Sequence, residues 1–442
     1  MIKRIAFVAL AALFTVTACN KAAGGLSPDG YVNQGTKVAD KNSALTPYEQ
    51  KQKLEETGKE LISEVEVDKW KSTAEFIRAL GEHLQEVAED DDRAFDAFEE
   101  WSESIEDEML YTKKRDSKLT MRVSYALSKL PKGTFKEDDG RFEFTEGGSD
   151  VKIITEVDGK AVTITLTNGA EGREYEVYSE NWKAENDWQR RYYDGESYTE
   201  WDETVSIRIP AWVNVEVRDG AARRLNWRVN FNFTDTDGNT KVELEKDAAQ
   251  VNTEFKFDDY TLSASSKYSS SNGTGYASES SAISRGSKVL VATGAETEVE
   301  IDGSIEDGYK GTQDKTVKVA LDVLGKVQAK GTVDFAKMEY YGDKIDRYAD
   351  EEQFAKAVRN LESCTDIAIY YDRKAGRQAW YGLEPFYNDT YGYWSYSPVI
   401  RFADDSSYGV DEFFNEKSFS SLMNALDRWM EDVSDYFSAF TD

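Results

Sequence analysis

From about residue 131 the chain alternates apolar and polar side chains, and this alternation constrains the fold more than any other feature. Val213, Val215 and Val217 alternate with polar residues, and segments 227–233 and 317–323 follow the same rule. A period of two places every second side chain on the same face of a β-strand, which is typical of antiparallel sheets with one buried face. We therefore predict an antiparallel β domain over residues 131–340.

Short turn sequences separate these predicted strands. Asp-Gly and Asn-Gly pairs accept the positive φ angles that tight hairpin turns require. Such pairs begin at Asp139, Asp158, Asn168, Asp194, Asp219, Asp237, Asn272, Asp302 and Asp307. Their frequency favours a meander of hairpins over parallel βαβ units. The serine-rich segment Leu262–Ser287 fits either a hairpin of small side chains or a loop, and the hairpin is favoured.

Helical signals flank this region on both sides. Thr46-Pro47-Tyr48-Glu49 is a capping box with proline at the first helical position, and apolar residues then recur at helical spacing over 70–87 and 95–109, and less clearly over 119–130. Residues 46–130 are therefore predicted to be helical. Residues 341–442 combine a helix capped by Asp350, short strands and a closing helix over 419–437. The predicted fold class is α+β, with helices before a hairpin-rich antiparallel sheet and a C-terminal α+β segment.

The first residues form a positively charged start, Lys3 and Arg4, followed by the apolar run Ile5–Val16. This run is shorter than the roughly 20 residues that span a bilayer, and it has the length of a secretory signal. The sequence Val16-Thr17-Ala18-Cys19 resembles the lipobox of bacterial lipoproteins. The alternative is an ordinary signal peptide with an incidental cysteine.

That resemblance implies removal of residues 1–18 as a signal peptide and attachment of a diacylglyceryl group to the Cys19 thiol. It also implies fatty acylation, such as palmitate, of the new amino end. Two or more chains anchor a protein stably, whereas one chain is marginal. Asn20 at the next position is compatible with passage to the outer membrane, and which face the protein occupies stays open. Residues 19–45 are expected to be a lipidated tether. The rest of the chain resembles uncharacterised Gram-negative envelope lipoproteins only loosely.

The charge balance excludes one class of partner. Asp and Glu number 84 against 54 Lys and Arg, which gives a formal net charge of −30. Such a chain repels phosphate backbones and anionic lipid headgroups, so no nucleic acid is expected as a partner. Membrane contact would then come from the acyl chains.

Histidine and cysteine are too rare for several kinds of catalysis. His83 is the single histidine, and Cys364 is the one cysteine besides Cys19. His83 fits the edge of an apolar helix stripe, and Cys364 fits a small buried residue. A zinc site of histidines and thiolates is therefore not expected, and no cofactor or catalytic residue is assigned. Asp235–Asn239 resembles a calcium loop superficially, but a hairpin turn explains it better.

Aromatic residues are the most suggestive feature, because they make up 13% of the chain and gather in two polar segments. Rings presented from polar loops can stack on the faces of sugars, while the competing interpretation is strand core with cross-strand aromatic pairs. The candidate ligand-binding residues are Trp188, Tyr192, Tyr193, Trp201, Trp380, Tyr391, Tyr393 and Trp394.

Three functions remain open at this stage, and binding is favoured over catalysis because the residues that most often do chemistry are missing or undistinguished. The first is a non-enzymatic binding or scaffold protein of the outer membrane, with a glycan or an apolar molecule as ligand. The second is a glycoside hydrolase with paired carboxylates, although 84 acidic residues single out no pair. The third is a structural partner of another envelope protein, whose identity the sequence does not indicate.

Overall fold

The computed structural model describes residues 38–90, 128, 130–181, 202–234, 241–242, 248–271, 274–300, 316–409 and 413. The described helices are α2 (Pro47–Glu64), α3 (Val67–Asp90), α7 (Phe335–Gly342) and α8 (Glu351–Glu362). The strands before residue 250 are β1 (Gly133–Asp138), β2 (Arg141–Glu146), β3 (Val151–Val157), β4 (Lys160–Asn168), β5 (Glu171–Asn181), β6 (Asp202–Pro210), β7 (Trp212–Asp219), β8 (Ala222–Thr234) and β9 (Lys241–Val242). The later strands are β10 (Ala248–Phe257), β11 (Tyr260–Ser271), β12 (Thr274–Arg285), β13 (Lys288–Glu300), β14 (Thr316–Val323), β15 (Val327–Asp334), β16 (Thr365–Tyr371), β17 (Ala379–Asn388), β18 (Tyr393–Phe402) and β19 (Ser407–Gly409).

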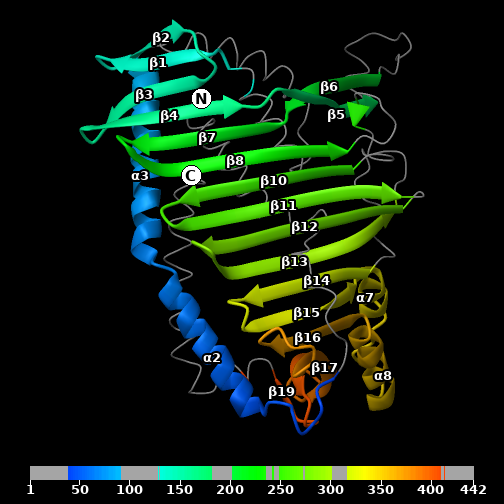
Figure 1. Cartoon of the computed structure of the whole chain (residues 1–442). Helices are drawn as coiled ribbons and strands as arrows, with labels where there is room; N and C mark the ends of the chain where they lie inside the picture. The colour runs from blue at the N-terminus through cyan, green and yellow to red at the C-terminus, as the bar shows by residue number, and fades with distance from the viewer. Residues whose placement is uncertain are drawn as a thin grey trace.

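Sixteen of the described strands form one long sheet (Figure 1). Its order is β19-β18-β17-β16-β15-β14-β13-β12-β11-β10-β8-β7-β4-β3-β1-β2, and β5, β6 and β9 form a separate small sheet. Neighbours in the long sheet are antiparallel, apart from the parallel pair β1 and β3. The predicted α+β class with a mostly antiparallel sheet is confirmed. The sheet runs without interruption past residue 340, because β15 pairs with β16.

The sheet has an apolar face and a polar face, as the alternation of the sequence requires. In β8, Leu225, Trp227 and Val229 are buried, while Asn226 and Arg228 between them are only half-buried. The antiparallel register keeps directly opposed residues on one face, so that this separation continues from strand to strand. The apolar face therefore forms a continuous surface that other elements cover.

Helices α2 and α3 follow one another along the sheet (Figure 1), with α3 toward β1–β4 and α2 toward β16–β19. Leu80, Leu84 and Val87 of α3 join the same apolar core as Phe135 and Leu225 of the sheet. Leu54 of α2 instead packs with Ala379, Ile400 and Phe402. The apolar stripe of α3 therefore covers the apolar face of the sheet. In α2 the buried side chains are polar, namely Gln50, Lys51 and Thr57, and Gln50 donates to the Gln378 carbonyl at 3.0 Å.

The point between α2 and α3 is fastened to the sheet. The Tyr260 hydroxyl, from the start of β11, donates to the Glu64 carbonyl and accepts from the Glu66 amide, each at 2.8 Å. Arg285 binds Asp259 at 2.8 Å and also pairs with Glu66. These bonds raise the pKa of the Arg285 guanidinium and keep it charged. The buried tyrosine fixes the position at which one helix ends and the next begins.

Several local sequence predictions are confirmed, but the hairpin turn predicted at Asn168 is wrong, because β4 pairs with β7 and β5 pairs with β6. The capping box at Thr46 forms in full, and the Asp350 side chain caps α8. Asp139 and Gly140 both adopt positive φ, at 52° and 74°, as a tight hairpin turn requires. The serine-rich segment forms the predicted hairpin of β11 and β12. The proposed helices over 95–109 and 419–437 and the Asp235–Asn239 turn lie outside the described residues, as does most of 119–130.

The described part of the chain includes no helix that is both long and apolar enough to cross a membrane.

Candidate functional site

The β17–β18 hairpin ends in a turn that presents aromatic side chains. The Asn388 carbonyl accepts bonds from the amides of Tyr391 and Gly392 at 3.2 and 2.8 Å, and the Asn388 side chain accepts from Thr390 and Tyr391. Gly392 closes the turn at a φ of 69°, where a residue with a Cβ would be strained. The turn is therefore fixed by its own hydrogen bonds, and it places Tyr391 outward with 69% of its surface exposed.

Three tyrosines from two distant segments form what we call the tyrosine platform: Tyr348, Tyr391 and Tyr393. The rings of Tyr391 and Tyr393 stack with centroids 5.7 Å apart, and Tyr348 meets Tyr393 edge-on at 6.3 Å. Tyr348 is 80% exposed, and the Arg347 guanidinium lies 5.5 Å from the centre of the Tyr393 ring. An exposed group of aromatic rings at one place indicates a binding surface, because isolated exposure is ordinary and clustered exposure is not.

The platform rests on a rigid base. The amide of Trp394 donates to the Arg347 carbonyl at 2.8 Å, which ties the loop after α7 to the start of β18. The Trp394 ring stacks on Phe354 of α8 at 5.8 Å, and Phe354 is 1% exposed. Glu362 at the end of α8 accepts bonds from the Leu383 amide and from Arg401, both at 2.9 Å. The helix and the hairpin therefore hold one another in place beneath the exposed rings.

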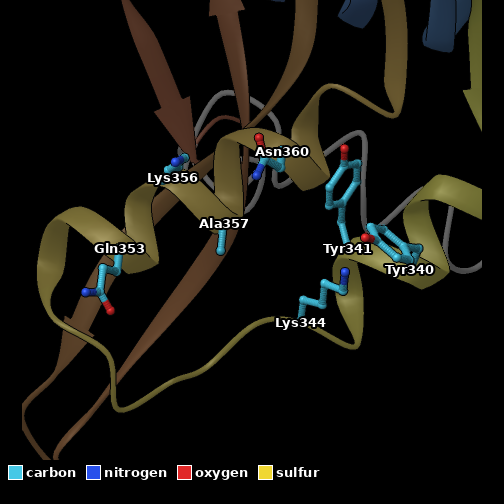
Figure 2. A pocket seen from close by; sticks show the side chains of 7 residues that line it. All are labelled: Tyr340, Tyr341, Lys344, Gln353, Lys356, Ala357 and Asn360. Carbon is cyan, nitrogen blue, oxygen red and sulfur yellow. The ribbon is translucent and has the colours of Figure 1, made fainter.

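A groove lies between α7 and α8 (Figure 2), and its lining residue Lys344 is four residues before Tyr348 of the platform. Its volume is about 250 Å³, and it is lined by Tyr340, Tyr341, Lys344, Gln353, Lys356, Ala357 and Asn360. The Lys344 ammonium lies 3.5 Å from the centre of the Tyr340 ring, a cation–π contact. The groove thus combines aromatic surface with hydrogen-bond donors, which is the composition of a small-ligand site.

The structure separates the aromatic residues that the sequence placed together. Tyr391 and Tyr393 belong to the platform, whereas Trp394 packs beneath it in the apolar cluster of α8. Trp380 lies farther along β17, half-buried between Ala368 and Arg401 on the neighbouring strands. The remaining predicted contacts, Trp188, Tyr192, Tyr193 and Trp201, lie outside the described residues. Cys19 lies outside them as well.

Sequence reasoning missed two parts of this site. Tyr348 and the groove residues Tyr340 and Lys344 come from the loop and helix that follow β15. The tyrosines in this stretch of polar sequence are the only sequence signal for a site here. No local pattern connects them with the β17–β18 turn, which follows more than forty residues later. Their relation to the hairpin depends on how α7 and α8 pack.

The groups most often used in catalysis have other roles. His83 Nε2 lies 2.9 Å from both the Glu137 carboxylate and the Thr155 hydroxyl, where α3 meets the sheet. Cys364 is a buried free thiol, and burial raises its pKa, so the reactive thiolate is disfavoured. Among the described residues, no three His, Cys, Asp or Glu side chains are arranged to hold a metal ion.

No family model, no curated protein and no solved structure matches the chain. The site must therefore be interpreted from its own geometry. That geometry is an outward group of rings on a rigid base beside a polar groove.

Proposed function

We propose that this chain is a lipid-anchored envelope protein, placed at the outer membrane, that binds glycans through the tyrosine platform without catalysis. The observation that carries the proposal is that the exposed rings of Tyr348 and Tyr391 both pack against the half-buried ring of Tyr393. Tyrosine offers both an apolar ring face and a hydroxyl, so it suits sugars, which present C–H faces and hydroxyl edges. Because Tyr348 and Tyr391 each already contact the Tyr393 ring, part of their side-chain freedom is restricted before a ligand binds.

Anchoring rests on the lipobox-like sequence that ends at Cys19. We expect Cys19→Ser, produced in a bacterial host that modifies lipoproteins, to release the protein from the membrane fraction because no thiol remains to carry the acyl chains. Membrane fractionation and mass spectrometry of the amino-terminal peptide measure this. Equal retention of the Cys19→Ser protein, or an unmodified leader on the native product, would contradict the anchor.

The platform is tested by removing its two most exposed rings. We expect Tyr348→Ala combined with Tyr391→Ala to weaken binding to the polysaccharide that the unaltered protein binds by at least about tenfold, or about 1.4 kcal/mol. Affinity electrophoresis in gels that contain starch, xylan, β-glucan or polygalacturonate identifies that polysaccharide and measures the loss.

The matched control is Tyr276→Ala, which removes a tyrosine that is 41% exposed on β12. This control should leave affinity unchanged. Equal retention of the double variant and the unaltered protein would show that the rings are not the binding surface. Release of reducing sugar from any of these polysaccharides would instead support the hydrolase alternative.

A further inference from the structure

We propose that the α7–α8 groove binds the anionic groups of an acidic polysaccharide whose sugar rings lie on the tyrosine platform. This inference rests on the proposed function and specifies its ligand class. It starts from the spacing of residues on α8. Lys356, Ala357 and Asn360 lie three, four and seven residues after Gln353, so the four residues share one face of the helix.

That face is distinct from the one that packs in the core. Phe354, Val358 and Leu361 are the buried residues of α8, and they contact the sheet through Leu383. The amphipathic helix thus has one side fixed to the hairpin and another side turned to the groove. Figure 2 shows the lining residues of α8 on one side of the groove and Lys344, Tyr340 and Tyr341 on the other.

The charge of the groove is opposite to the charge of the chain. Two lysines and no acidic residue line it, although the formal net charge of the protein is −30. Within the part of the chain that the structure describes, neither Lys344 nor Lys356 forms an ion pair, while Lys53, Lys69 and Lys288 on or against the helices each do. Two ammonium groups that share a groove without a carboxylate can accept a carboxylate or sulfate ligand.

Uncharged donors complete the anion site. The Gln353 and Asn360 amides and the Tyr341 hydroxyl line the same groove (Figure 2), and each can donate to an oxyanion or to sugar hydroxyls. A bound anion would also be held over aromatic surface, where the Lys344 ammonium already lies against Tyr340. The composition therefore fits a charged sugar better than a neutral one.

The groove and the platform are joined by a short piece of chain. Lys344 and Tyr348 are four residues apart, so their Cα atoms are separated by at most about 14 Å. A short oligosaccharide covers this span. One chain of sugars can thus place its rings on the platform and a neighbouring acidic group in the groove, so that the two surfaces act on one ligand.

The test compares polygalacturonate, whose uronic acids carry carboxylates, with a neutral galactan. At about 0.15 M salt, where screening limits the long-range repulsion between the acidic chain and an acidic polysaccharide, the unaltered protein should bind polygalacturonate at least about tenfold more tightly than the neutral galactan. At about 1 M salt this preference should fall, because the contacts of the two lysines are screened as well. Combining Lys344→Gln with Lys356→Gln should remove the preference but leave binding to the neutral galactan. As a control, Lys152→Gln removes one positive charge from an exposed position on β3. It should change neither the preference for polygalacturonate nor the binding to the neutral galactan.

Dextran sulfate, which carries sulfate but no carboxylate, separates the two anion types, because tighter binding than to polygalacturonate would assign the groove to sulfate. Equal affinity for acidic and neutral polysaccharides would overturn the groove inference and leave glycan binding intact. The groove inference would also be overturned if the double lysine variant still preferred the acidic polysaccharide. If the unaltered protein bound none of the polysaccharides, the proposed function itself would be overturned. Thermal unfolding of each variant shows whether it is folded.

Discussion

Trp70→Ala is expected to lower the free energy of unfolding by about 3–5 kcal/mol, which is typical of emptying a buried tryptophan site. Trp70 is 7% exposed at the start of α3, and its ring meets Phe257 edge-on at 4.9 Å and Tyr260 at 5.4 Å. Tyr260 in turn holds Glu64 and Glu66 between the two helices. The substitution therefore opens a cavity at the position where both helices are fastened to the sheet.

Tyr48→Ala is the matched control, because it removes a large ring from the neighbouring helix at a site that is 68% exposed. Its effect should stay within about 0.5 kcal/mol. Urea unfolding followed by circular dichroism measures both proteins. An equal, small loss of stability in the two variants would show that α3 does not depend on this contact.

Glu279→Gln is expected to make the protein more stable than the unaltered chain above pH 7, by up to about 3 kcal/mol. Glu279 lies on β12 between Ala277 and Ser281, and it opposes Ser266 and Ala295 on neighbouring strands. Burial raises the pKa of this carboxyl from 4.5 to about 7, although a hydrogen bond with Ser266 acts in the opposite direction. Glu279 and Ile283 are four residues apart on β12, so both side chains point to the apolar face of the sheet.

The sign follows from where the proton is released. In the unfolded chain Glu279 ionises near pH 4.5, whereas in the folded chain it keeps its proton until about pH 7. Its contribution to stability is therefore complete below pH 4.5 and is lost as the pH rises through 7. Glutamine stays neutral and does not lose this contribution.

The experiment compares urea unfolding of the unaltered protein and Glu279→Gln from pH 4.5 to 8.5. The difference between them should be small at the acidic end and largest above pH 7. Glu143→Gln, at an exposed position on β2, controls for the general effect of removing one acid from an acidic chain. A difference that does not change with pH, or one as large for Glu143→Gln, would contradict the prediction.

Much of the secondary structure follows from signals only a few residues long. The capping box at Thr46 needs only Glu49, and the turn at Asp139 needs only the glycine after it, so both could be predicted from the sequence. Alternation likewise identified which side of β8 is buried, because successive side chains of a strand must point to opposite faces.

The candidate site depends on longer distances. The aromatic content of segment 380–396 indicated Tyr391 and Tyr393, but it also included Trp394, which lies in the base, and Trp380, which lies elsewhere on the strand. Exposure separates these residues, and exposure depends on which neighbours arrive from other parts of the chain. Sequence spacing has no information about that.

The sequence by itself determined the α+β class, the helix starts at Thr46 and Asp350, the hairpin turn at Asp139 and the two faces of the sheet, because each depends on backbone geometry within a few residues. The tertiary structure alone brought Tyr348 against Tyr393, placed Lys344 and Lys356 at one groove, and made Glu279 a half-buried carboxyl with a raised pKa. Ring contacts, local charge and desolvation all depend on atoms that are distant in the chain, so only packing decides them.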